Sequence, residues 1–472
     1  MSTSGTRPRA ALILFRLSIV LIAAIFLCAC CSRAFGSSLD FDTFKLGQGN
    51  AAALVIGGIQ GDEPGGFSAA TLLATRYEIT KGAIWVVPNL NFPSIVKRSR
   101  GLHGDMNRKF ARLEPNDPEY ATVRRIQELI SHPNVNLVLN LHDGSGFYRP
   151  AYKDKLKNPS RWGQSVIIDQ ADLAADTFMG DLLNRANEAS ATANNALIEP
   201  THAIHVRNTK TAEGDIEMEK SLSYFAARQN KAAFGIEASK EFPVNIRAYY
   251  HLLIVESLLK QAGIQFTRDF DLTPSGIKKA LSENVEVAFA GNRIFLPLED
   301  ARPSINLLPL PVSDRPITSK PIMAVLPCAN DNSYLCIHYG NRKIAQIKPD
   351  WREINDELDA VKATVDGKEI IAPFGQILEV GKEVTIEPIK GFRVNAIGYD
   401  KGGKDEAGIP LRRKDFETRF SIDRSGRLFR VEVYKGKTIA GMFLLRFGGK
   451  PQLAQHKALL PEKKGPESDL GF

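Results

Sequence analysis

Cysteine is scarce in this chain, and its few positions argue against one class of catalytic site. Three of the five cysteines in the 472-residue sequence lie before residue 32, which leaves Cys328 and Cys336 for everything that follows. Neither is near a candidate base in the sequence, so a cysteine nucleophile is not expected. In an oxidising compartment the short segment between them is compatible with a local disulfide, and two free thiols are the alternative.

Blocks of like charge and internal repeats are also missing. The formal net charge is +8 and the isoelectric point is about 9.1, which favours an anionic partner. Because the lysines and arginines are scattered, a nucleic acid is not expected, whereas an anionic polymer such as the glycan-peptide of a cell wall fits. A hydrophobic content of 43% allows a sizeable core, and the length suggests about three domains.

Residues 1–36 form a separate unit that we expect to direct export. A basic beginning is followed by an apolar run over residues 17–28 and by the small residues Ala34 and Gly36, the pattern of a cleaved signal peptide. Two alternatives stay open: a lipoprotein sequence with Cys30 as the lipidated residue, and an uncleaved membrane anchor. Each of the three predicts a periplasmic or other extracytoplasmic location for the rest of the chain.

Strand and helix patterns alternate from residue 37 to residue 268. The predicted strands cover residues 51–56, 84–87, 135–141 and 232–236, and the predicted helices cover residues 67–77, 120–130, 172–195 and 244–262. This alternation predicts an α/β fold with a mainly parallel sheet flanked by helices. In such sheets, sites form beyond the C-terminal ends of the strands.

The composition changes after residue 268, where short alternating runs between Gly, Pro, Asn and Asp turns replace the long helical patterns. We predict a central β-domain at 269–355 and a small antiparallel sandwich at 356–450. A charged stretch at 350–358 is interpreted as a linker between them. The tail at 451–472, rich in Lys, Glu, Pro and Gly, is expected to be disordered.

A glycine-rich turn at residues 57–66 connects the first predicted strand to the first predicted helix. It carries Gln60 and Glu63, and two donors at this spacing can both reach one metal ion. His142 follows the predicted strand 135–141 on a second glycine-rich loop. A single histidine after a strand is more often structural, but together with the earlier turn it predicts a complete metal site.

The basic segment at residues 98–110 and Glu237 are each compatible with a non-functional role when taken alone. The basic segment at residues 98–110 is either a solvated loop or an anion-binding segment, in which guanidinium groups form paired bonds with a carboxylate. Glu237 directly follows the predicted strand 232–236, and taken alone it is interpreted as a surface carboxylate at a strand end.

As a set, these residues resemble the carboxypeptidase A-like zinc carboxypeptidases. The motifs that carry the resemblance are Gln60-x-x-Glu63, Asp105-Met-Asn107-Arg108-Lys-Phe110, His142 and Phe234-Gly-Ile-Glu237. The sequence is most similar to the bacterial cell-shape-determining D,L-carboxypeptidases, which have Gln in place of the first His ligand. They also have a central β-domain and a C-terminal immunoglobulin-like domain, and the resemblance covers essentially the whole chain after the export segment.

The resemblance implies a role for each motif. It makes Gln60, Glu63 and His142 the ligands of one Zn²⁺ ion. Asn107 and Arg108 would hold the free C-terminal carboxylate of the substrate.

The same resemblance makes Glu237 the general base, which moves a proton from water to the leaving amine. The arginine that stabilises the oxyanion would be Arg98 or Arg100, and the sequence does not decide between them. Trp162 and Tyr224 lie on segments between the metal ligands and the base, and they are candidates for substrate contacts.

Gln60 is the main departure from the general family pattern. Its neutral amide oxygen is a weaker donor for zinc than an imidazole nitrogen. Asp105 lies where the family places the carboxylate that orients the first ligand. We therefore expect Asp105 to accept a hydrogen bond from the Gln60 amide and turn its oxygen toward the metal.

The predicted function is trimming of peptidoglycan stem peptides from tripeptide to dipeptide, with release of meso-diaminopimelate. The β-domains would provide surfaces for cell-wall or membrane proteins. One alternative is a deacylase of N-acyl amino acids with the same fold, although such a small substrate does not require the β-domains. The other is a non-catalytic wall-binding relative, which would not need Glu237.

Overall fold

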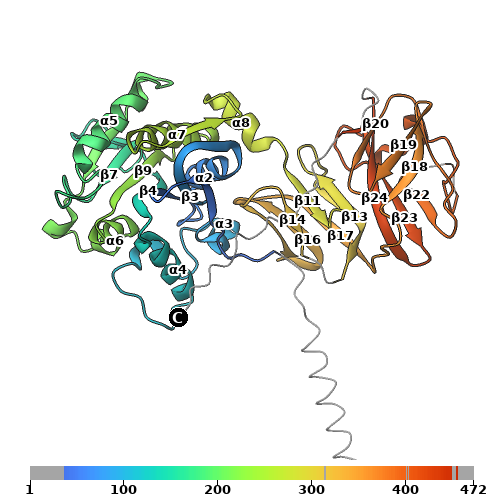
Figure 1. Cartoon of the computed structure of the whole chain (residues 1–472), viewed down its shortest axis with the longest axis horizontal. Coiled ribbons are helices and arrows are strands. Elements are labelled where there is room, and N and C mark those ends of the chain that lie inside the picture. Colours follow the sequence, from blue (N-terminus) through green and yellow to red (C-terminus); the bar gives the residue numbers. More distant parts are fainter. Residues whose placement is uncertain (1–36, 313–314, 400, 402, 449–452, 455–472) are drawn as a thin grey trace, which may run out of the picture.

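The computed structural model describes residues 37–312, 315–399, 401, 403–448 and 453–454. The predicted export segment and most of the predicted disordered tail lie outside the described residues. Three parts follow one another along the chain and in space, with the α/β part at one end and the central β-domain in the middle (Figure 1). Within the described ranges no helix is long and apolar enough to cross a membrane.

A mixed, mainly parallel sheet forms the α/β part, as predicted. Strands β3, β2, β4 and β9 run parallel to one another, and β1, β10 and β7 join them in antiparallel pairs. The strand order is β1(Phe44–Gln48), β3(Tyr77–Val87), β2(Ala52–Ile56), β4(Val135–Gly144), β9(Ala232–Ser239), β7(Ser165–Ile168) and β8(His205–Asn208), with β10(Gln265–Arg268) paired to β3. A short pair beside the sheet consists of β5(Phe147–Tyr148) and β6(Lys157–Asn158).

Helices cover both faces of this sheet. One face packs against α2(Pro64–Arg76), α5(Leu182–Asn194) and α7(Val244–Gln261). The other face packs against α4(Tyr120–Ser131) and α6(Leu222–Arg228). The predicted helix at 172–195 is wrong over its first ten residues, because Met179 adopts a positive φ of 54° and α5 begins only after Asp181.

The central β-domain follows α8(Pro274–Ser282), a helix that the composition did not indicate. It consists of a three-stranded and a four-stranded sheet, with strand orders β12(Ile294–Pro297), β11(Glu286–Phe289), β14(Ile317–Thr318) and β13(Ser304–Pro311), β17(Arg342–Arg352), β16(Asp331–Tyr339), β15(Met323–Cys328). Cys328 and Cys336 form a disulfide between β15 and β16. The predicted linker at 350–358 is wrong in its first three residues, which complete β17.

This central domain shares one core with the α/β part. Phe67 of α2 and Ile95 of α3(Phe92–Lys97) belong to the same buried apolar cluster as residues of β11, β12 and β15. Apolar burial of this kind is the main stabilising contribution to a domain contact. The β-domain is therefore built directly onto the helices that follow the Gln60–Glu63 turn.

Two sheets form the C-terminal domain and enclose a common core, as expected for a sandwich. The first has the order β19(Lys368–Pro373), β18(Ala360–Val365), β21(Val384–Ile386). The second has the order β22(Arg393–Ala396), β23(Leu428–Lys435), β24(Thr438–Phe447), β20(Ile377–Val380), β25(Leu453–Ala454). The expectation of a purely antiparallel sandwich is wrong at one pair, because β20 runs parallel to β24.

Candidate active site

The turn after β2 buries Gln60 and Glu63 at the C-terminal edge of the sheet, with 2% and 3% of their surfaces exposed. Pro64 occupies the first turn of α2, where its missing N–H is not needed. Glu63 is the N-cap residue of α2, but its side chain makes no capping hydrogen bond. Its carboxylate is therefore directed to other partners.

His142, at the end of β4, lies against both of these residues. Its Nδ1 atom is 2.9 Å from Glu63 Oε2 and 3.2 Å from Gln60 Oε1. Burial alone would lower the pKa of His142, but the hydrogen bond and charge of Glu63 outweigh burial and raise it. The structure thus brings together the three side chains that the sequence predicted as metal ligands.

The donor types and the two known separations are compatible with one tetrahedral metal ion. Ligand atoms at about 2.1 Å from such an ion lie about 3.4 Å apart, and His142 Nδ1 lies 3.2 Å from Gln60 Oε1 and 2.9 Å from Glu63 Oε2. In the described part of the chain, no three His, Cys, Asp or Glu side chains are grouped to hold a metal. The proposed set contains two such residues, and its third donor is the amide oxygen of Gln60.

Asp105 makes the predicted contact with Gln60. The Gln60 Nε2 group donates to Asp105 Oδ1 over 2.7 Å, which leaves Oε1 facing His142. Burial would raise the pKa of Asp105, but the hydrogen bond from Gln60 and the charges of Arg100 and Arg108 lower it. An ionised Asp105 is a strong acceptor, so the amide of Gln60 is held in one orientation.

Asp143 connects the two halves of the site from the opposite face of the sheet. Its carboxylate accepts hydrogen bonds from the backbone N–H of Gly65 and from Arg247, and it pairs with His251 at 3.1 Å. A Cβ atom at Gly65 would lie 2.3 Å from Asp143 Oδ1, so only glycine permits this approach. The start of α2 is thereby fixed to the end of β4, beside His142.

Glu237 lies next to His142 because β4 and β9 are paired in register at these two residues. Its Oε2 atom is buried and has no hydrogen-bond partner among the described residues. Burial raises the pKa of Glu237 to about 8, and although the charges of His142 and Lys240 oppose this shift, those of Glu63 and Asp143 add to it. A carboxyl group in this state is suited to accept and return a proton near neutral pH.

The predicted carboxylate-binding residues lie on the 3₁₀ turn η1(Met106–Arg108). Asn107 Oδ1 accepts from the backbone N–H of Leu222 at the start of α6, and its Nδ2 is 3.5 Å from His142 Nε2. Tyr224 follows two residues later on α6 and is partly buried. Arg108 donates to the carbonyl of Asn107 and is partly exposed.

The two candidate oxyanion arginines point to different places. Arg100 lies 3.6 Å from Glu63 Oε1 and donates to Asp105 over 2.9 Å. Arg98 instead donates to the backbone carbonyl of Asn341 in the central β-domain, and it is in the left-handed region with φ of 55°. Arg100 therefore lies near one predicted metal ligand, Glu63, and bonds to Asp105, whereas Arg98 contacts the neighbouring domain.

Trp162 lies beside Glu237, close to Gly144. A Cβ atom at Gly144 would be 2.6 Å from Trp162 Cβ and 2.7 Å from Glu237 Oε2, so a larger residue would separate them. Arg207 was not predicted from the sequence, and its guanidinium lies 3.7 Å from the centre of the Trp162 ring. Lys240 was not predicted either, and its Nζ is 3.6 Å from Glu63 Oε1.

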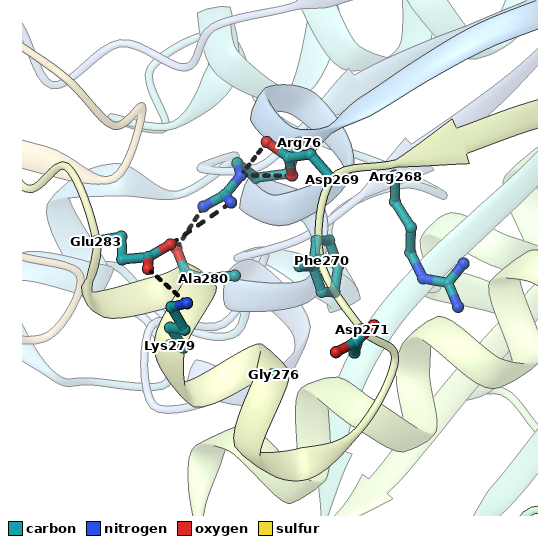
Figure 2. A pocket seen from close by; sticks show the side chains of 9 residues that line it. All are labelled: Arg76, Arg268, Asp269, Phe270, Asp271, Gly276, Lys279, Ala280 and Glu283. Carbon is teal, nitrogen blue, oxygen red and sulfur yellow. Dashed lines mark hydrogen bonds and ion pairs between the residues drawn. The ribbon is translucent and has the colours of Figure 1, made fainter.

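A pocket elsewhere, between the end of α2 and α8, does not include any of these residues (Figure 2). Its charged side chains mainly pair with one another, since Arg76 bonds Asp269 over 2.6 Å and Glu283 lies near both Arg76 and Lys279. Arg268 and Asp271 also line it and have no interaction with the other residues drawn, although Arg268 lies 3.5 Å from Glu256 outside the pocket. We place the candidate site at the sheet edge, because Gln60, Glu63 and His142 converge there and none of them lines this pocket.

Comparison with known proteins identifies the family. A family model described as "Carboxypeptidase controlling helical cell shape catalytic" matches residues 22–282, and a second, "C-terminal domain of metallo-carboxypeptidase", matches residues 354–448. No curated protein matches the chain.

Solved structures of the cell shape determinant Csd4 from Helicobacter pylori are similar over most of the chain. The tripeptide-bound form has 38% sequence identity and a TM-score of 0.80, covering 86% of this chain and all of that one. The form bound to mDAP, described as a D,L-carboxypeptidase, has 40% identity and a TM-score of 0.78, covering 84% and 96% of the two chains. The chain therefore belongs to the metallo-carboxypeptidases that control helical cell shape.

Proposed function

We propose that this protein is a zinc-dependent D,L-carboxypeptidase that acts on peptidoglycan outside the cytoplasm. Its substrate would be a tripeptide stem, and its products would be a dipeptide stem and free meso-diaminopimelate. Family membership supports the reaction class, and the related structures contain a tripeptide or mDAP. The predicted export segment supports the location.

One observation carries the proposal: an unpartnered, buried carboxylate oxygen of Glu237 lies next to a convergent set of metal donors. We assign Gln60, Glu63 and His142 as the zinc ligands. Bound zinc would act as a Lewis acid that polarises the scissile carbonyl and makes water a stronger nucleophile at neutral pH.

Glu237 is then the group that moves the proton. Its Oε2 atom would take a proton from the attacking water and give it to the nitrogen of the leaving amino acid. The raised pKa of about 8 favours retention of the proton between these two events, and a nearby cation would bring the pKa down toward neutrality.

The anion contacts are divided between two arginines. We assign Arg108, together with Asn107, to the terminal carboxylate of the substrate, because both lie on η1 beside His142. We assign Arg100 to the charge that develops on the scissile carbonyl oxygen, since it already contacts Glu63. Trp162 and Tyr224 are assigned to the walls around the substrate.

Incubation with defined muropeptides tests the proposal. The purified full chain with one equivalent of zinc is expected to convert a tripeptide stem to a dipeptide and to release meso-diaminopimelate, measured by mass spectrometry. The Glu237→Gln variant and chelator-treated protein serve as inactive controls. An intact tripeptide in the presence of zinc-loaded protein would overturn the proposal and favour a wall-binding role.

A further inference from the structure

Arg207 is a half-buried cation that no carboxylate neutralises. Its Nη1 group donates to the backbone carbonyl of Arg161 over 2.9 Å, and the structure gives it no ion pair with any described residue. Its guanidinium lies between aromatic rings, 3.7 Å from the centre of Trp162 and 5.2 Å from that of Tyr148. Most of its five N–H donors are left without an assigned acceptor.

The strand registers place Arg207 on the same face of the sheet as the catalytic groups. Arg207 on β8 is paired with Ile167 on β7, which is paired with Gly235 on β9. Gly235 precedes Glu237 by two residues, so both belong to one face of β9. Val206 packs into the core on the side of α5 and α7, and this leaves Arg207 on the side of the site.

Trp162 links this cation to the catalytic carboxylate. A Cβ atom at Gly144 would lie within 2.7 Å of both Trp162 Cβ and Glu237 Oε2, and the guanidinium of Arg207 lies over the Trp162 ring, 3.7 Å from its centre. Burial lowers the pKa of Arg207, while the negative field of Tyr148, Glu237 and Asp215 opposes this effect. Burying a cation without an anion has a cost in folding free energy, so its retention here suggests a ligand that supplies the anion.

The neighbouring polar group on this face is also incomplete. Asn140 on β4 is paired with Gly235 on β9, two residues before the pair formed by His142 and Glu237. Its Oδ1 atom is buried without a partner among the described residues, and 1% of the residue is exposed. This oxygen is an acceptor, and a carboxylate is also an acceptor, so Asn140 does not contribute to carboxylate binding, which depends on the unpaired donors of Arg207.

We propose that Arg207, stacked on Trp162, binds a second carboxylate of the peptide substrate and so determines which stem peptides are cleaved. This inference rests on the proposed function, in which Asn107 and Arg108 already hold the C-terminal carboxylate. A planar guanidinium fixed on an aromatic ring binds a carboxylate through two parallel hydrogen bonds, which lysine cannot reproduce.

The stem peptide contains two carboxylates that fit this role. One is the distal carboxylate of meso-diaminopimelate, and the other is the α-carboxylate of the γ-linked glutamate. Both present the same chemistry to a guanidinium, so substrate variants must separate them.

Three tripeptides and two variants make the test. The parent substrate ends in γ-D-glutamyl-meso-diaminopimelate, the second has lysine in the last position, and the third has the glutamate α-carboxylate amidated. The wild type is expected to lose about 10- to 100-fold in kcat/KM on the tripeptide that lacks the recognised carboxylate. Arg207→Ala is expected to cleave that tripeptide and the parent within about threefold of each other, and Arg207→Lys is expected to be intermediate.

Arg228→Ala, at an exposed arginine of α6, is the matched control and should keep the wild-type preference. Arg207 variants that slow all three substrates by one common factor would overturn the proposal, as would variants that leave all three unchanged. Calorimetry of the same peptides binding to zinc-loaded Glu237→Gln, with and without Arg207→Ala, repeats the comparison without turnover. If no peptide is cleaved by the wild type, the proposed function fails. If Arg207→Ala leaves the affinities for all three peptides unchanged, the role of Arg207 fails.

Discussion

Two carboxylates at neighbouring strand ends, on opposite faces of one sheet, have opposite environments. Asp143 faces α7 and is satisfied by Gly65, Arg247 and His251, which together lower its pKa against the effect of burial. Glu237 faces the site with an unpartnered oxygen and a pKa raised to about 8. The difference separates a group that holds the site together from a group that is free to react.

The largest expected effect is the loss of kcat when Glu237 is replaced. Glu237→Gln keeps the shape of the side chain but removes the proton acceptor, so kcat should fall by about 10²- to 10⁴-fold with zinc content and the folded structure retained. Steady-state cleavage of the tripeptide, with metal analysis of the same sample, measures both. A variant that kept more than a tenth of the activity would contradict the role of Glu237.

Loss of the Asp143 carboxylate should lower the free energy of unfolding. Asp143→Ala leaves Arg247 and His251 without their buried partner, and the free energy of unfolding should drop by about 3–5 kcal/mol. Urea denaturation compared with Asp176→Ala, at an exposed aspartate, provides the measurement and its control. An equal and small effect of both substitutions would mean that Asp143 does not join the two halves of the site.

Arg98 and Arg100 also differ in role: we expect Arg100 to affect catalysis and Arg98 to affect stability. Arg100→Ala should lower kcat by about 10²- to 10³-fold, as expected for a donor to the developing oxyanion. Arg98→Asn, which tolerates the left-handed backbone, should leave kcat within about threefold and cost about 1 kcal/mol of stability through the lost bond to Asn341. A larger activity loss at Arg98 than at Arg100 would reverse the assignment.

A final expected effect is a pH dependence of stability that has opposite signs at the two carboxylates. In metal-free protein Glu237 holds its proton more tightly when folded, so its contribution to stability is lost as pH rises from about 4.5 to about 8. The contribution of Asp143 is present above its ordinary pKa and is lost as pH falls. The unfolding free energy of Glu237→Gln relative to wild type should thus increase between pH 5 and pH 8, by at most about 1.4 kcal/mol per pH unit. A constant difference across this range would contradict the raised pKa.

Strand and helix positions around the metal donors could be predicted because apolar periodicity and glycine-rich turns are local signals. Strands β2, β4 and β9 and helices α2, α4 and α7 lie close to where the sequence placed them, and the parallel order of the strands brings Gln60, Glu63 and His142 together. The predicted loop position of His142 is wrong, because pairing with β9 extends β4 to Gly144. The predicted hydrogen bond from Gln60 to Asp105 is also present.

Other features depend on contacts that no local pattern encodes. The choice between Arg98 and Arg100 follows from one positive φ and from a carbonyl 243 residues away. Arg207 lies on a four-residue strand, and its position became visible only through the stacking on Trp162. The start of α5 was missed because the interruption at Met179 and Gly180 is a backbone feature within an Ala-rich segment.

Metal content tests the central claim most directly, because every assignment depends on Gln60, Glu63 and His142 holding one ion. Wild-type protein and the control Gln48→Ala, at an exposed glutamine of β1, should each retain one zinc ion after dialysis against a weak chelator. Gln60→Ala should retain none, because the remaining two protein donors are too few for a stable site. Full zinc retention by Gln60→Ala, with unchanged affinity, would contradict the ligand set.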